Sequence, residues 1–270
     1  MRKFLIVFFI FLFCNVAVAD TARETATDTG LRDGPFYVSI GAQTYYYEYE
    51  EPGVMKNEGW FYGIAYSVSY EEDVLIKLDG AVAFGWVDYT STSSGSSDDI
   101  KDIMADTRGI LGYSIYNNEN TKITPFIGLG YRFLEDDSSN ELTTTNNIGY
   151  LRESKYWYSP IGVSIEFKLG NGWTIIPEAE YDFFWSGEQK SYLGYLAGYE
   201  DIVNEQEEGY GYRFSLAFEK KTDMRSYGFG IFYRYWNIDD SDITIDRWGR
   251  GWIEPKNDTS EFGLSVTIIF

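Results

Sequence analysis

The chain has 270 residues, of which 42 are acidic and 22 basic, and its formal net charge is −20 with no histidine. Nucleic acid is a poor partner for so acidic a chain, because its phosphates carry the same sign of charge. The single cysteine, Cys14, falls in an N-terminal segment that we expect to be removed, so the mature chain has no disulfide framework and no thiolate chemistry.

The first 19 residues match a secretory signal peptide. A basic head at 1–3 precedes ten consecutive apolar residues at 4–13, and residues 17–19 read Ala-Val-Ala, an A-x-A cleavage pattern. The apolar run is too short for a comfortable transmembrane helix, and no later stretch reaches ~18 continuous apolar residues. We therefore expect a signal peptide at 1–19, a flexible periplasmic lead-in at 20–34, and one domain at 35–270.

From residue 36 onward, apolar residues alternate with small or polar ones. Runs of ~10 alternating residues are longer than typical strands of soluble proteins, and they match the ~9–11 tilted residues with which a strand crosses a bilayer. The alternation predicts an all-β, closed antiparallel transmembrane barrel of ten strands, with eight or twelve as alternatives. The predicted strands lie near 36–43, 60–70, 74–86, 105–116, 123–133, 156–169, 174–185, 209–220, 227–236 and 259–270.

The predicted connections alternate in length along the chain. Short periplasmic turns opposite long external loops are typical of outer-membrane barrels, whereas a soluble up-and-down barrel, the alternative, has no reason to sort its loops. The short turns are predicted at 71–73, 117–121, 170–172 and 221–226, and the long loops at about 47–58, 88–104, 135–155, 186–208 and 237–258. An upper aromatic belt is predicted from Trp60, Trp86, Trp157 and Trp185, near the outer ends of their strands.

These features resemble the bacterial outer-membrane β-barrel superfamily. Residues 124–131 (TPFIGLGY) are similar to strands of small opacity-type and porin-like barrels. The resemblance implies a location in the cell outer membrane, contact with its lipid and lipopolysaccharide, and insertion by the barrel-insertion machinery; we expect a monomer. The last strand is similar to the C-terminal insertion signal of such proteins, carried here by Phe262, Leu264, Val266, Ile268 and Phe270.

Size and strand number are also similar to those of the ten-stranded omptin proteases. Those enzymes use a paired-aspartate and aspartate–histidine site, and this chain has no histidine onto which that site can be carried over. Lipid A deacylases and palmitoyltransferases of the same membrane also use histidine as a general base. Because histidine is the commonest proton carrier near neutral pH, we expect no enzymatic activity and no cofactor.

With the apolar set facing lipid, the other set faces the lumen and carries charges of both signs. A barrel of this strand number is about filled by its own side chains, and an unpaired buried charge costs several kcal/mol, so we predict an ion-pair network that plugs the lumen; a narrow charged pore is the alternative. Three carboxylates of this network, Glu178, Glu180 and Asp182, lie about 7 Å apart along one strand face and could instead bind a cation or act in acid–base chemistry. The network comprises Lys77, Asp79, Asp106, Arg108, Arg132, Glu166, Glu178, Glu180, Asp182, Arg213, Arg234 and Glu261.

Two features of the predicted loops point to binding. Acidic loops near anionic lipopolysaccharide favour bridging Ca²⁺ or Mg²⁺, and Asp239, Asp240 and Asp242 form a local candidate that lacks the glycine and distal glutamate of a calcium loop. Aromatic rings beside arginine are typical of binding hot spots. The second candidate is therefore the ligand-binding tip at Trp248, Arg250 and Trp252, whose indoles could instead return to the membrane rim.

The favoured function is structural or surface interaction: acidic, aromatic external loops that meet lipopolysaccharide, cations or an extracellular ligand. A narrow passive porin-type channel for small solutes is the second hypothesis. The third is an outer-membrane hydrolase that works without histidine.

Overall fold

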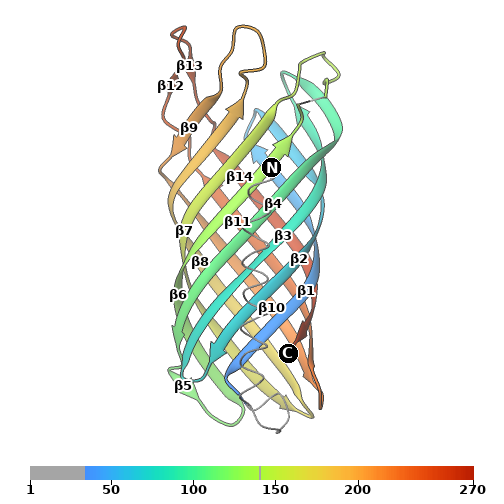
Figure 1. Ribbon diagram of the computed structural model, residues 1–270, viewed down its shortest axis with the longest axis vertical. Helices are drawn as coiled ribbons and strands as arrows, with labels where there is room; N and C mark the ends of the chain where they lie inside the picture. Colours follow the sequence, from blue (N-terminus) through green and yellow to red (C-terminus); the bar gives the residue numbers. More distant parts are fainter. Residues whose placement is uncertain (1–33, 140) are drawn as a thin grey trace, which may run out of the picture. The chain divides into compact units, whose positions relative to one another are not determined.

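The computed structural model describes residues 34–139 and 141–270, so the predicted signal peptide and nearly all of the lead-in lie outside the described residues. Ten long antiparallel strands close into a barrel, which confirms the predicted fold class and strand number (Figure 1). In the described part of the chain, no helix is long and apolar enough to cross a membrane. The barrel strands are β1 (Phe36–Glu51), β2 (Met55–Glu71), β3 (Val74–Ser91), β4 (Gly95–Tyr113), β6 (Thr121–Asp137), β7 (Leu151–Gly170), β8 (Trp173–Tyr192), β10 (Gly209–Lys221), β11 (Ser226–Ile238) and β14 (Asn257–Ile269), and the short strands are β5 (Tyr116–Asn117), β9 (Ile202–Gln206), β12 (Thr244–Ile245) and β13 (Gly251–Trp252).

The last barrel strand closes the sheet. β14 pairs with its neighbour β11 and with the first strand, β1, in a register that runs from Ser39 opposite Ile269 to Glu50 opposite Asp258. The backbone N–H of Phe270 then donates to the carbonyl of Val38 at 2.8 Å. Every barrel strand therefore has two partners, and no open sheet edge faces the lipid.

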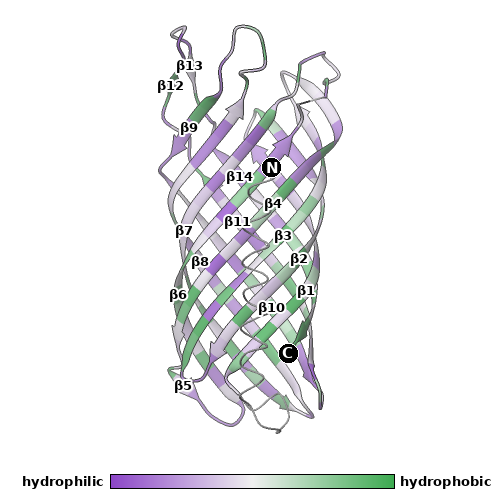
Figure 2. Cartoon of the chain, in the orientation of Figure 1, coloured by the Kyte–Doolittle hydropathy of each residue, from purple (hydrophilic) through white to green (hydrophobic). Residues whose placement is uncertain are grey.

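The alternation in sequence corresponds to side chains that point alternately outward and into the lumen. In β14, Phe262 and Val266 are exposed on the outer surface, whereas Glu261 between the outward positions is 1% exposed and faces the lumen. Hydrophobic residues follow the middle and lower parts of the strands, and hydrophilic residues gather toward the hairpins at the upper end (Figure 2). The predicted insertion ladder thus lies on the lipid-facing side.

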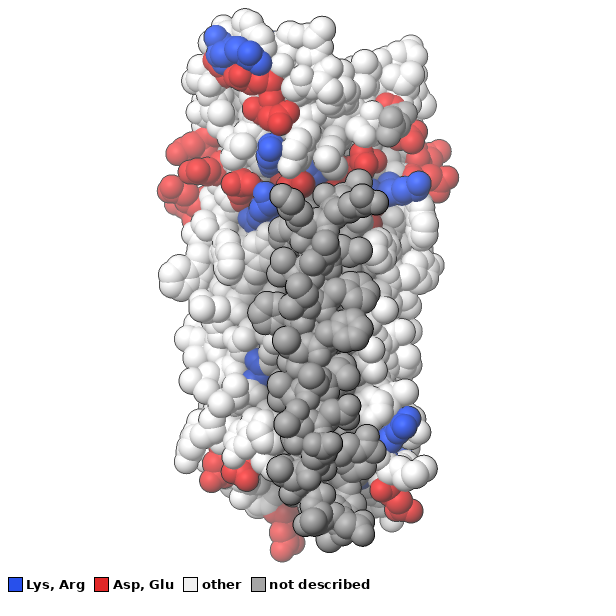
Figure 3. Space-filling model, in the orientation of Figure 1, with Lys and Arg blue, Asp and Glu red and all other residues white. Residues whose placement is uncertain are grey.

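Aromatic and charged residues mark the upper limit of the apolar band. Trp60 and Trp86 lie directly opposite each other in neighbouring strands, and both are exposed. The outward position opposite Trp86 on β4 is already charged, Lys101, and its partner on β6 is Asp137. On the face seen in Figure 3, acidic and basic side chains form a row across the upper part of the barrel, above a mostly uncharged band. The membrane boundary therefore lies near these tryptophans.

Two of the predicted long loops are wrong. β1 and β2 continue to a tight turn at 52–54, and β3 and β4 continue to one at 92–94, with positive φ at Gly53 and Gly95. Outward residues here meet water, so they are polar and resemble loop sequence, while many of the inward residues stay apolar. That upper interior includes Tyr47, Tyr49, Met55, Val87 and Ile100. The connections at 138–150, 193–208 and 239–256 remain long, with β9 in the second and β12 and β13 in the third.

Because the outer face of the barrel meets lipid, a charged substitution there should destabilise the protein most near the middle of the membrane. Ile64 lies midway between Trp60 and the lower end of β2 and is strongly exposed. We expect Ile64→Arg to lower the free energy of unfolding by about 2–4 kcal/mol, because arginine at the bilayer midplane is that unfavourable. Urea unfolding in lipid vesicles measures the change. Glu50→Arg, an exposed position above the apolar band, is the matched control, and equal effects of the two substitutions would contradict the assigned membrane level.

Candidate functional site

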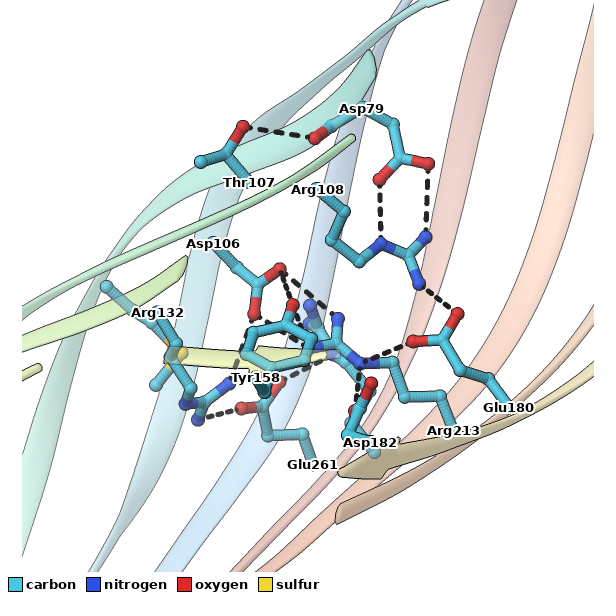
Figure 4. A network of polar contacts seen from close by, with 12 residues as sticks. Asp79, Asp106, Thr107, Arg108, Arg132, Tyr158, Glu180, Asp182, Arg213 and Glu261 are labelled. Atoms are coloured by element: carbon cyan, nitrogen blue, oxygen red, sulfur yellow. Dashed lines mark hydrogen bonds and ion pairs between the residues drawn. The ribbon is translucent and has the colours of Figure 1, made fainter. Parts of the chain in front are cut away.

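Arginine 213 is the centre of a charge network that crosses the lumen. From β10 it reaches its neighbour β8, with Nε 2.7 Å from Asp182 Oδ2, and the far strand β4, with Nη2 2.9 Å from Asp106 Oδ2 (Figure 4). A residue 107 positions away in sequence is thus held by two hydrogen bonds from one guanidinium. Such charge-assisted pairs are the strong hydrogen bonds of protein interiors.

A second arginine extends the network along β4. Arg108 makes a bidentate contact with Asp79 of β3, with N–O distances of 2.9 and 3.1 Å, and its third nitrogen lies 2.5 Å from Glu180 of β8. Arg213 also approaches Glu180, at 3.3 Å. The carboxylate of Glu180 therefore joins the two arginines.

Glutamate 261 ties the closing strand into the network. Its side chain lies 2.5 Å from Arg132 of β6 and 2.7 Å from Arg234 of β11. Arg132 is in turn 3.9 Å from Asp106. The inward glutamate of the C-terminal strand thus connects the seam of the barrel to its opposite wall.

Aromatic rings fill the space between the ions. The Tyr158 hydroxyl donates to Asp106 Oδ1 at 2.9 Å and accepts from Arg213 at 2.7 Å, and the Trp236 ring lies 5.9 and 5.8 Å from the guanidinium carbons of Arg132 and Arg213. Position 130 is glycine because the Tyr158 ring occupies the place of a side chain there. Tyr158 and Trp236 were not predicted as site residues, since an inward aromatic has the same sequence signal as a lipid-facing one.

The central network is electrically balanced. Five cations face five carboxylates, and the side chains of Glu180, Asp182 and Glu261 are fully buried. The other side chains of this network are at most 20% exposed, so the ions at this level of the barrel are largely buried. The ten residues are Lys77, Arg108, Arg132, Arg213, Arg234, Asp79, Asp106, Glu180, Asp182 and Glu261.

The two other predicted network residues lie nearer the periplasmic end. Glu166 pairs with Lys122 at 3.5 Å, and Glu178 is 4.0 Å from Lys77. All twelve predicted residues therefore make ion pairs. The side chains of Glu178, Glu180 and Asp182 each contact a lysine or an arginine.

A second structured region lies at the outermost hairpin, β12–β13, at the far end from the apolar band (Figure 1). Asp246 Oδ1 accepts from the backbone N–H groups of Trp248 and Arg250, both at 2.9 Å, and Oδ2 accepts from Arg250 Nε at 2.6 Å and from the Trp252 indole at 3.1 Å. Desolvation raises the pKa of Asp246, but these hydrogen bonds outweigh it and hold the pKa well below its ordinary value.

The same arginine locks the hairpin onto the segment before β9. Arg250 donates to the carbonyl of Gly198 at 2.9 Å, and its guanidinium lies 4.7 Å from the Tyr199 ring and 4.9 Å from the Trp248 ring. Of the three predicted ligand-binding residues, Arg250 and Trp252 are engaged internally, whereas Trp248 remains 49% exposed. We call the hairpin with Tyr199 the aromatic tip.

The structure does not bring the three predicted metal ligands of the same loop together. Asp239 pairs with Lys256 Nζ at 2.7 Å, and the side chain of Asp240 accepts the backbone N–H of that lysine at 2.8 Å. Two of the predicted ligands Asp239, Asp240 and Asp242 are thus engaged by one lysine, the first through its side chain and the second through its backbone. Among the described residues, no group of three or more acidic, histidine or cysteine side chains could hold a metal ion.

Comparison with known proteins places the fold. No family model matches the chain, and no curated protein sequence matches it. The solved structure of the outer membrane protease OmpT from Escherichia coli is similar, with a TM-score of 0.56 at 9% identity, over 91% of this chain and 100% of that one. The Pseudomonas putida toluene transporter TodX (TM-score 0.37, 8% identity, 88% and 89% covered) and the β domain of the Bordetella autotransporter BrkA (0.39, 11%, 86% and 98%) also match. The fold is that of the bacterial outer-membrane β-barrels.

The network predicts a large cost for removing one cation. Arg213→Met leaves Asp106 and Asp182 buried without their main partner, and we expect a loss of about 3–5 kcal/mol in the free energy of unfolding. Adding Asp182→Asn restores the charge balance and should recover part of that loss. Urea unfolding in vesicles measures both.

The control is Arg247→Met, an exposed arginine whose loss should change stability by no more than about 0.5 kcal/mol. Equal stabilities of the Arg213 variant and the wild type would show that the network does not stabilise the barrel.

Proposed function

We propose that the chain is a surface-display barrel, closed to solutes, whose outer hairpins bind a protein partner. Support for the closed barrel comes from the central network, where charges balance and aromatic rings occupy the remaining space. In this proposal the barrel is an anchor, and function resides in the connections on its outer end.

The aromatic tip is the observation that carries the proposal. Asp246 and Arg250 fix its conformation, yet Trp248 stays half-exposed and three isoleucines beside it in sequence are more exposed still. A loop that served only to keep the protein soluble would have no use for such residues. Rigid aromatic anchors surrounded by apolar side chains are typical of protein-binding hot spots. The isoleucines are Ile243 (65% exposed), Ile245 (62%) and Ile253 (50%).

The charge of the chain suggests the character of the partner. With a formal net charge of −20, the protein attracts basic surfaces and repels acidic ones. Charge complementarity of this kind raises the association rate and makes binding sensitive to ionic strength. A basic protein surface with an apolar pocket fits the tip best.

The proposal is non-enzymatic. OmpT carries the word protease in its own description, and its likeness to this chain at 9% identity concerns the fold. Here the inward carboxylates of β8 are engaged by arginines, and there is no histidine to act as a base.

A closed lumen predicts an absence of conductance. We expect wild-type protein in planar bilayers to give no stable current steps, because no hydrated ion can pass the packed network. A general porin inserted under the same conditions is the control for bilayer quality. Regular steps from the wild type, with a size that changes in an Arg132→Ala, Arg213→Ala double variant, would support the narrow-channel hypothesis instead.

We expect Trp248 of the aromatic tip to make the dominant contact with the partner protein. Cells that display the protein should be retained on basic members of a panel of immobilised proteins, and Trp248→Ala should weaken this retention at least about tenfold, the effect of losing a hot-spot side chain. Raising the salt concentration should weaken it further.

Tyr116→Ala is the matched control, since Tyr116 is similarly exposed (51%) but lies at the opposite end of the barrel. Equal retention of the Trp248 variant and the wild type, or no retention across the panel, would refute the role of the tip.

A further inference from the structure

A second polar cluster lies in the upper lumen, and its charges do not balance. Four carboxylates, Glu51, Asp102, Asp136 and Glu254, are buried there. Among the described residues that form ion pairs with them, Arg152 is the one base, at 3.2 Å from Glu51 and 2.9 Å from Asp136. Four acids against one base leave an excess of three negative charges when all are ionised, whereas the central network has none.

Two of these carboxylates are direct neighbours. Asp102 of β4 lies opposite Asp136 of β6 in the strand register, and both point inward, at 1% and 6% exposure. Asp136 Oδ2 accepts from Arg152 and, at 3.2 Å, from the amide of Asn57 on β2. Like charges directly opposite each other in a sheet are destabilising unless something lies between or beside them.

The oxygens that remain have no donor. Both carboxylate oxygens of Asp102, the second oxygen of Asp136 and the amide oxygen of Asn57 are buried without a hydrogen-bond partner. Buried acceptors are nearly always satisfied in native proteins, and four from three neighbouring side chains indicate an absent positive or donating species.

Apolar packing surrounds Asp102 on its other sides. Ile100 and Met104 flank it along the strand, and both are buried. The position opposite it on β3 is Gly85, which the Phe61 ring covers. Solvent therefore cannot satisfy this carboxylate from the side of β3.

Electrostatics agrees with that geometry. The outward neighbours at this level, Lys101, Glu135 and Asp137, are charged, so the pair lies above the apolar band. Two ionised carboxylates buried side by side repel each other, and Arg152 is the one base in the described part of the chain that pairs with them.

A small cavity lies beside these oxygens, on the side of Asp136 and Asn57. Its volume is about 10 Å³, and Arg152, Tyr47 and Tyr49 are among its other walls, whereas Asp102 is not. This is the space of a single water molecule or one bare ion.

We infer that Asp102, Asp136 and Asn57 form a buried cation site of the calcium type. Oxygen-only ligands, two of them anionic, suit a hard cation, and Ca²⁺ accepts irregular geometry where Mg²⁺ demands an octahedron and keeps its waters. A divalent ion would reduce the excess of three negative charges to one. Since the ligands come from β2, β4 and β6, the ion would link these three strands below the connections at 52–54, 92–94 and 138–150.

Terbium luminescence tests the site in the full mature protein, refolded in detergent without lipopolysaccharide. Tb³⁺ replaces Ca²⁺ in oxygen sites and emits when a nearby tyrosine is excited, and Tyr47 and Tyr49 both line the cavity. We expect a saturable signal that Ca²⁺ displaces at a concentration on the order of 10⁻⁴ M, in the range of extracellular calcium modules, and that Mg²⁺ displaces at least about tenfold less effectively.

Matched variants separate this site from the acidic outer surface. Asp102→Asn keeps the shape but removes a ligand charge, so it should abolish the Ca²⁺-displaceable signal. Asp137→Asn, two residues beyond Glu135 on the outward face of the same strand, should leave that signal unchanged.

The same variants give a second test of the cation site, in which the unfolding midpoint is measured with and without Ca²⁺. Ca²⁺ should raise the unfolding midpoint of the wild type and of Asp137→Asn, but not that of Asp102→Asn. Wild-type protein without displaceable terbium would overturn the proposal and leave a water or a proton as the occupant. Equal signals from Asp102→Asn and the wild type would also overturn it, by assigning the ion to the exposed acids.

Discussion

Charge neutralisation inside a closed wall is the constraint on which this structure depends. Once the barrel closes, its inward side chains lose most of their contact with water, and each buried charge then needs a partner of opposite sign. The central lumen meets this demand with arginines that reach across the barrel, such as Arg213 between β8 and β4. In the proposed function, the same pairs also occupy the space through which a solute would pass, so one arrangement would both hold the walls together and close the lumen.

Much of the fold could be predicted from the sequence because a strand in a membrane has two solvents. Every second residue meets lipid, and this gave the ten strands, their inward and outward faces and the twelve charged residues that pair in the lumen. The predicted loops were wrong above the membrane, where β1 to β4 continue as strands. There both faces differ from the pattern below, since water replaces lipid outside, and aromatic and aliphatic residues join the charged ones inside.

Features set by three-dimensional proximity could not be predicted. The composition of the loop at 237–258 suggests binding. Only the structure shows that Arg250 holds the tip in its conformation and that Trp248 is the most exposed of the three predicted ligand-binding residues. Likewise, Asp102 is one acidic residue among 42 in the sequence. Its unusual situation arises from Asp136, which is 34 positions away in the numbering and becomes its neighbour through the pairing of β4 with β6.

The pairing of the first and last strands has a consequence for how the barrel assembles. Glu261 belongs to the final strand, yet it neutralises Arg132 of β6 and Arg234 of β11. Arg234 already lies opposite Glu261 in the pairing of β11 with β14, whereas Arg132 on the opposite wall gains this carboxylate only when the barrel closes. Contacts so distant in sequence form slowly. Reopening the seam would break the twelve paired positions of β1 and β14 and separate Glu261 from Arg132, so we expect the finished barrel to open slowly.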